Sequence, residues 1–86
     1  MRIELLVTTP CSICQQAQAV WERIAAEQNV PLHVIDVAHP EGEALMTRLA
    51  LKTVPAVVVN GKLSGIGVPS KEDAERIIGT IGLRGE

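Results

Sequence analysis

Short apolar segments alternate along the chain with stretches in which apolar residues recur every three or four positions. Three of the apolar segments have the length and the β-branched content of strands, and they are Ile3–Val7, Leu32–Val37 and Ala56–Val59. Only Glu4 interrupts the first of them, which predicts a mostly buried strand. Pro10 lacks a backbone N–H group and is expected to end this segment.

A helical repeat follows the first strand and begins at Cys11. Its inward side is predicted to hold small and aliphatic residues together with the only aromatic residue of the chain: Ile13, Cys14, Ala17, Val20, Trp21, Ile24 and Ala25. The outer face holds polar and charged residues, as expected for a helix that covers one face of a sheet: Gln15, Gln16, Gln18, Glu22, Arg23 and Glu27. Asn29 and then Pro31 provide the cap and the breaker that end the helix.

Two further helices are predicted. One runs from about Pro40 to Leu51, with acidic residues in its first turn and basic residues near its end, an order that suits the helix dipole. The other begins with the capping-box-like segment Ser70–Asp73. Its inward residues are Ala74, Ile77, Ile78 and Ile81. Gly82 is expected to end this helix and to leave Leu83–Glu86 as a frayed tail.

A hairpin joins the last two strands. Asn60-Gly61 is a strong hairpin signal, because both central residues of a type I′ turn need a positive φ. Lys62–Ser64 is then a short antiparallel strand, and Gly65, Gly67 and Pro69 form a bend. The predicted order is βαβαββα, an α/β fold with a four-stranded mixed sheet. Its first two strands should be parallel, and helices should cover both faces.

Length and composition indicate one small globular domain that spans residues 1–86. The chain has 86 residues, of which 47% are hydrophobic and 21% charged, so a second core has no room. The net charge is −2, and neither a basic cluster nor an aromatic platform suggests a nucleic-acid partner. No signal-peptide pattern and no apolar run of about 20 residues is present. We therefore expect a cytoplasmic protein without a membrane partner.

The two cysteines of the chain, Cys11 and Cys14, lie at the predicted junction of strand and helix. A bridge between them closes a very short loop and removes little chain entropy, so it would be a poor structural staple. In a reducing compartment this spacing indicates redox or metal chemistry instead. A helix N-terminus stabilises a thiolate, which makes Cys11 the expected nucleophile. Cys14, one turn deeper, is expected to resolve the mixed disulfide.

These motifs together resemble the thioredoxin–glutaredoxin superfamily: Cys-x-x-Cys after a first strand, the βαβαββα order, and Thr-Val-Pro before a valine-rich strand. The small size and the Gly-Val-Pro-Ser-Lys-Glu segment are similar to the glutaredoxin-sized thioredoxin-like proteins of prokaryotes. The resemblance implies a minimal thioredoxin-like fold and a thiol–disulfide oxidoreductase that acts on protein or small-molecule disulfides. It implies no bound cofactor, and electrons from an external reductase or a low-molecular-weight thiol. We expect a monomer.

The resemblance also implies roles for residues outside the cysteines. Pro55 is expected to be cis and to lie opposite the dithiol. Thr53 and Val54 would shape the substrate groove, with the backbone of Val54 pairing with an extended substrate segment. Ser12 and Ile13, between the cysteines, would tune the redox potential.

The chain departs from the superfamily pattern in three places. Cys-Ser-Ile-Cys replaces the Gly-Pro pair typical of thioredoxins and the Pro-Tyr pair typical of glutaredoxins. Thioredoxins carry a buried acid at the position of Leu5, and Glu4 beside it should point to the other face of the strand. The acid with which glutaredoxins bind glutathione is missing from Ser64–Ser70, although Lys52 could meet a glutathione carboxylate.

Two other classes of function stay open from the sequence. A zinc ligand set is available in Cys11, Cys14, His33 and His39. Residues 15–32 separate its second and third members, an interval longer than usual. The resemblance to glutaredoxins adds a related alternative, a dimer bridged by an iron–sulfur cluster that Cys11 holds, although such relatives usually have one active cysteine. The other class is a non-catalytic adaptor that binds a partner in the groove around Val54 and Gly65–Gly67.

Overall fold

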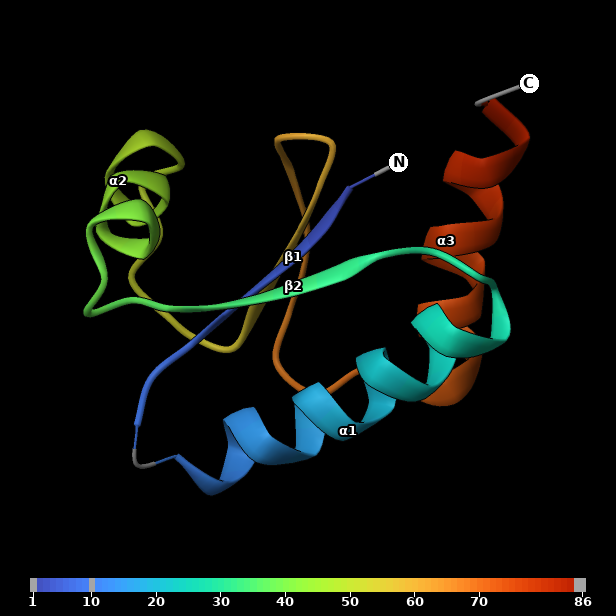
Figure 1. Cartoon of the computed structure of the whole chain (residues 1–86), viewed down its shortest axis with the longest axis horizontal. Coiled ribbons are helices and arrows are strands. Elements are labelled where there is room, and N and C mark those ends of the chain that lie inside the picture. Colours follow the sequence, from blue (N-terminus) through green and yellow to red (C-terminus); the bar gives the residue numbers. More distant parts are fainter. Residues whose placement is uncertain (1, 10, 85–86) are drawn as a thin grey trace.

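The computed structural model of the chain describes residues 2–9 and 11–84. Its elements are β1 (Ile3–Val7), α1 (Ser12–Glu27), β2 (Leu32–Asp36), α2 (Pro40–Arg48), β3 (Ala56–Val59), β4 (Lys62–Ile66) and α3 (Lys71–Arg84). This order confirms the predicted βαβαββα arrangement (Figure 1). Pro10, which we expected to end the first strand, lies outside the described residues.

The four strands form one mixed sheet in the order β2-β1-β3-β4. β1 pairs in parallel with β2 and antiparallel with β3, and β4 is antiparallel to β3. The parallel pair is the predicted consequence of a helix that connects two strands. β1 therefore has a strand on each side and is buried along its whole length.

Helices cover both faces of the sheet, as predicted (Figure 1). The larger hydrophobic cluster lies on the face covered by α1 and α3, and it contains Ile3, Leu5, Val7, Cys14, Ala17, Trp21, Ile24, Val57, Val59, Ala74 and Ile78. The smaller cluster lies under α2 and contains Leu6, Ile35, Leu45, Ala56 and Val58. Successive residues of β1 thus serve opposite faces, as the pleat of a strand requires.

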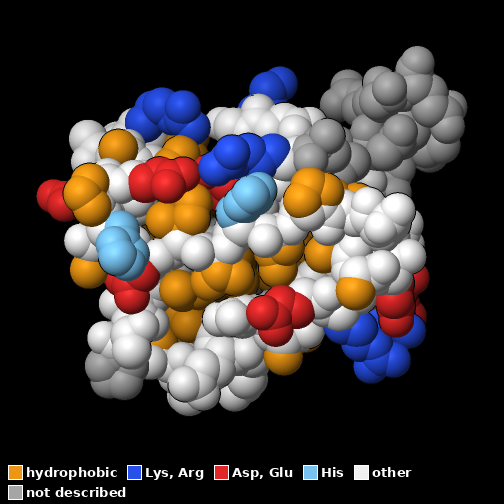
Figure 2. Space-filling model, viewed as in Figure 1, with side chains coloured by type: hydrophobic (Ala, Val, Ile, Leu, Met, Phe, Trp, Pro, Cys, Tyr) orange, Lys and Arg blue, Asp and Glu red, His pale blue; other side chains and the backbone are white. Residues whose placement is uncertain are grey.

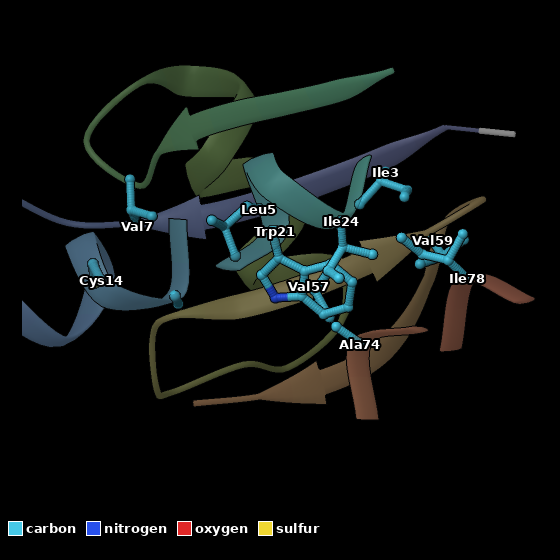
Figure 3. Close-up of a cluster of buried hydrophobic side chains, with 11 residues drawn as sticks. Ile3, Leu5, Val7, Cys14, Trp21, Ile24, Val57, Val59, Ala74 and Ile78 are labelled. Carbon is cyan, nitrogen blue, oxygen red and sulfur yellow. The ribbon is translucent and has the colours of Figure 1, made fainter. Parts of the chain in front are cut away.

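The buried side of α1 is rotated relative to the predicted stripe. Its fully buried residues include Cys14 and Trp21, whereas Ile13 is 54% exposed and Val20 is only half-buried. Two adjacent apolar rows run along this helix, and the sequence pattern does not settle which of them turns inward. Trp21 lies in the middle of the larger cluster, beside Ile24 and Val57 (Figure 3).

The helix ends follow local backbone geometry. α1 ends as predicted, because Asn29 adopts a φ of 57° and the Val30 amide donates to the Ala25 carbonyl at 2.9 Å, a Schellman-type end. α2 ends at Arg48 and not at Leu51, because Ala50 already adopts a φ of 53°. Alanine is a poor signal for this conformation, which explains the wrong boundary.

α3 is longer than predicted. Its start is confirmed, since the hydroxyl of Ser70 accepts a hydrogen bond from the Asp73 amide at 3.0 Å. The expected end at Gly82 is wrong, because the helix runs on to Arg84. A glycine inside a helix costs about 1 kcal/mol relative to alanine, and that cost weakens a helix without breaking it.

The hairpin between β3 and β4 has the predicted turn, with φ values of 52° at Asn60 and 83° at Gly61. β4 is longer than expected and continues through Gly65 to Ile66. Gly65 and Ile66 pair with Val57 and Ala56, and the register shifts between Val57 and Val58, where Ser64 of β4 has no partner. The bend therefore starts at Gly67, whose φ is 87°.

Gly42 permits the close approach of α2 to the end of β2. A Cβ at this position would lie 2.9 Å from the Val37 Cα and would also collide with the Asp36 carbonyl. We expect Gly42→Ala to lower the free energy of unfolding by about 1–3 kcal/mol, although alanine is the better helix former. Urea denaturation measures this change. Glu43→Ala on the exposed side of the same helix should stay within about 0.5 kcal/mol, and a Gly42→Ala protein as stable as wild type would contradict the packing.

No helix in the described part of the chain is long and apolar enough to span a membrane.

Candidate active site

Cys11 is the N-cap residue of α1, with extended backbone angles of φ −161° and ψ 107°. Its sulfur accepts a hydrogen bond from the backbone N–H of Cys14 at a distance of 3.0 Å. The first amides of a helix have no partner within the helix, and they carry the positive end of its dipole. The Cys11 sulfur therefore occupies a position that favours a thiolate.

The two thiols differ in burial and in proton affinity. Cys11 is half-buried, whereas Cys14 is 2% exposed and lies at the same end of the larger cluster as Val7 (Figure 3). The pKa of Cys11 is lowered, chiefly because the Cys14 thiol and then the Cys14 amide donate to its sulfur. The pKa of Cys14 is raised, first by burial and then because its thiol donates to Cys11. Both thiols are free, so the structure shows the reduced dithiol.

The loop before β3 meets the hydrophobic cluster that carries the dithiol. The Val54–Pro55 peptide bond is cis, and Pro55 is fully buried. Val54 is half-buried and packs against the larger cluster, as does Cys11. Thr53 is exposed on the same loop. The Pro55 carbonyl accepts a hydrogen bond from the Gly67 amide at 2.8 Å, which ties this loop to the end of β4.

Exposed apolar side chains accompany these elements. Ile13, between the cysteines, is 54% exposed, and Ser12 beside it is also exposed. Ile66 and Val68, on either side of the glycine that bonds to the Pro55 carbonyl, are 54% and 41% exposed. Ile13 thus lies between the two cysteines, and the Pro55–Gly67 hydrogen bond joins the segment of Ile66 and Val68 to the Val54–Pro55 loop.

Asp36 is a charged residue near the dithiol that the sequence did not indicate. It is the register partner of Val7 across the parallel β1–β2 pair, at the strand ends from which the chain leads to Cys11. Its negative charge contributes to the raised pKa of Cys14. The sequence did contain a signal for Asp36, since it is an acid near the end of a predicted strand. Parallel neighbouring strands end at the same edge of a sheet, so this acid could have been placed near the cysteines that follow the first strand.

The positions of Leu5 and Glu4 agree with the predicted alternation. Leu5 is fully buried in the larger cluster, so a hydrophobic side chain stands where thioredoxins were expected to carry an acid. Glu4 points to the α2 side, where it pairs with Arg2 at 3.4 Å and lines a pocket of about 350 Å³. This pocket lies across the sheet from the cluster that contains Cys14.

The structure does not assemble the zinc ligand set. His33 is exposed on β2 and His39 is the N-cap residue of α2, and the histidine side chains lie apart on the face shown in Figure 2. Among residues 2–9 and 11–84, no group of three or more His, Cys, Asp or Glu side chains is placed to hold a metal ion. Lys52, considered above as a glutathione contact, is exposed in the segment between α2 and β3.

The effect of the Cys14 thiol on the pKa of Cys11 gives a testable pH dependence. A donor to the Cys11 thiolate lowers the pKa of that group, so Cys14→Ala should raise it and move the alkylation of Cys11 to higher pH. The rate of Cys11 alkylation by iodoacetamide, measured across pH, reports this shift.

Cys14→Ser is the matched control, because its hydroxyl keeps a donor at the same position. Its profile should lie closer to that of the wild type than the Cys14→Ala profile does. Equal shifts in both variants would show that the donated hydrogen bond is not what lowers the pKa of Cys11.

Comparisons with known proteins agree with this fold. A family profile described as a thioredoxin domain matches residues 1–79. The thioredoxin of Methanocaldococcus jannaschii is 31% identical over 72 residues, which cover 84% of this chain and 85% of that protein. A protein of Archaeoglobus fulgidus named Probable Thioredoxin is 28% identical over 76 residues, which cover 88% of this chain and 84% of that protein.

A solved structure, thioredoxin 1 from Thermosipho africanus, superimposes with a TM-score of 0.75. The two chains are 21% identical, and the match covers 100% of each, which shows that they share a fold. With the family profile over residues 1–79, these findings show that the chain belongs to the thioredoxin family.

Proposed function

We propose that this protein is a thiol–disulfide oxidoreductase that reduces or exchanges disulfides in proteins or small molecules. The observation that carries the proposal is the unequal pair of thiols. Cys11 is half-buried with its sulfur held at a helix N-terminus, and Cys14 is buried one turn further along the same helix. The thioredoxin relatives support an oxidoreductase role at the level of the family.

The exchange has two steps. The Cys11 thiolate attacks one sulfur of the substrate disulfide, forms a mixed disulfide and expels the other sulfur as a thiolate. Cys14 then loses its proton and attacks the Cys11 sulfur, which closes a Cys11–Cys14 disulfide and releases the second substrate thiolate. The dithiol loses two electrons and the substrate gains them.

The unequal proton affinities suit this order. While Cys11 is a thiolate, its charge helps to raise the pKa of Cys14 and to keep that thiol protonated. Once Cys11 is part of a mixed disulfide its charge is gone, so Cys14 ionises more easily. The thiol that attacks second thus becomes reactive after the first step.

The surface around the dithiol suits an extended segment of a substrate. Ile13, Ile66 and Val68 offer apolar contacts. Thr53 and the backbone of Val54 lie on the loop that the Pro55–Gly67 hydrogen bond fixes. An extended chain bound there would use backbone hydrogen bonds for affinity and apolar side chains for selection.

The proposal includes an external source of electrons, either a reductase or a small thiol, and no bound cofactor. We further propose that residues 1–86 act as a single domain and as a monomer.

Catalysed turnover tests the proposed function. With dithiothreitol as the electron donor, a substoichiometric amount of wild-type protein should accelerate the reduction of a protein disulfide above the uncatalysed rate. The control is the Cys11→Ser/Cys14→Ser double variant, which lacks both thiols and whose fold is checked by circular dichroism. A wild-type rate equal to that of the double variant would contradict the proposal, and equally tight binding of the substrate by both proteins would then favour an adaptor.

A further inference from the structure

Asp36 ends β2 at the edge of the sheet where the dithiol lies. Its register partner on β1 is Val7, and side chains of paired residues on neighbouring strands point to the same face. Val7 belongs to the larger cluster together with Cys14, whereas Ile35 belongs to the cluster on the opposite face. The Asp36 side chain therefore points to the face on which α1 carries Cys14.

Hydrogen bonds hold both oxygens of the Asp36 carboxylate. Oδ1 accepts from the Ala38 amide at 2.8 Å, and Oδ2 accepts from the Thr9 hydroxyl at 3.1 Å. Thr9 lies in the connection between β1 and α1. The carboxylate thus joins the end of β2 to the segment that leads into Cys11.

The backbone of Asp36 is held as well. Its carbonyl accepts a hydrogen bond from the His39 amide at 3.0 Å, and the absence of a side chain at Gly42 lets α2 approach this carbonyl closely. The carboxylate therefore starts from a fixed backbone position and has little freedom to turn away from α1.

The charged and titratable groups that face Asp36 come from two elements. α1 contributes Cys14, with Cys11 at its cap, and the start of α2 contributes His39. The pKa of Asp36 is lowered, first by the Ala38 amide, then by the Thr9 hydroxyl, and also by the charge of His39. Asp36 therefore carries its negative charge at neutral pH. Among these groups, Cys11 and Asp36 are the two whose charges raise the pKa of Cys14.

We propose that Asp36 is a positioning residue of the dithiol site. Its anchored carboxylate holds a negative charge beside Cys14 and keeps that thiol protonated while Cys11 attacks the substrate in the first step of the exchange. This inference rests on the proposed function, because it assigns an order to the two thiols of that reaction. Asp36 acts through Cys14 and needs no contact with the substrate.

Titration of Cys14 in a protein without Cys11 tests the inference. In the Cys11→Ser protein, Cys14 is the only thiol, and the ultraviolet absorbance of its thiolate gives the midpoint of ionisation without access by a reagent. Adding Asp36→Asn removes the charge and keeps an oxygen that accepts hydrogen bonds. We expect the Cys14 midpoint to move to lower pH.

Thr9→Val in the same Cys11→Ser protein is the matched control, because it removes the hydroxyl contact and keeps the charge. Its midpoint should stay closer to the parent value than that of Asp36→Asn. An unchanged midpoint in Asp36→Asn, or an equal shift in Thr9→Val, would overturn the inference.

Salt provides a second measurement that needs no substitution at Asp36. Screening weakens the field of a partly exposed carboxylate, so the Cys14 midpoint of the Cys11→Ser protein should fall as ionic strength rises. A midpoint independent of salt would also overturn the inference. These titrations involve no turnover, so their failure is distinct from a failure of the catalytic assay.

Discussion

Replacing Cys11 with serine is expected to reduce the turnover of disulfide substrates to the rate of the electron donor alone. A serine hydroxyl stays protonated at neutral pH and does not attack a disulfide. Cys14 cannot take its place, because it is 2% exposed and its pKa is raised by burial. The catalysed rate with dithiothreitol as donor measures the loss.

Gln15→Ala is the control for this substitution, since Gln15 is exposed on the same helix and makes no part of the proposed site. Its turnover should match that of the wild type. A Cys11→Ser protein that keeps its turnover while Cys14→Ser loses it would reverse the roles proposed for the two thiols.

Trp21→Ala is expected to have the largest effect on stability. The side chain is 1% exposed in the middle of the larger cluster, and removing it leaves a cavity between α1 and the sheet. Substitutions of this kind cost about 3–5 kcal/mol. A chain of 86 residues is expected to have a free energy of unfolding of about 4–13 kcal/mol, so the loss is a large part of the total.

Urea denaturation followed by circular dichroism measures this loss, because the variant has no tryptophan fluorescence. Ile13→Ala removes an exposed apolar side chain from the same helix and should change the free energy of unfolding by only about 0.5 kcal/mol. A loss below about 1 kcal/mol in Trp21→Ala would contradict the central position of this side chain.

The sequence predicted the features of the fold that depend on local chemistry. Asn60 and Gly61 mark their turn because few residues accept a positive φ, and Ser70 marks the start of α3 because its hydroxyl can cap a helix. Ala50 also adopts a positive φ, but its side chain gives no such signal, so the end of α2 was misplaced. Ile13 was assigned to the core because periodicity does not fix the rotation of a helix against its sheet.

The same distinction holds for the candidate site. Cys11 and Cys14 are close in sequence, and a strand followed by a helix was enough to place them at the helix start. Asp36 reaches the same site only through the parallel pairing of β1 and β2. Its role depends on its side chain pointing to the same face of the sheet as Val7. That orientation is set by the register between β1 and β2, which are separated in the sequence by α1. Local patterns do not contain this information.

The most direct test of the central claim, attack by Cys11 and resolution by Cys14, is to trap the intermediate in Cys14→Ser. The variant keeps the nucleophile and lacks the thiol that releases it, so a mixed disulfide with the substrate should accumulate. Mass spectrometry after proteolysis should place the substrate on Cys11, while Cys11→Ser treated in the same way should yield no comparable adduct. An adduct on Cys14 of Cys11→Ser that forms as readily as the adduct on Cys11 would contradict the assigned roles.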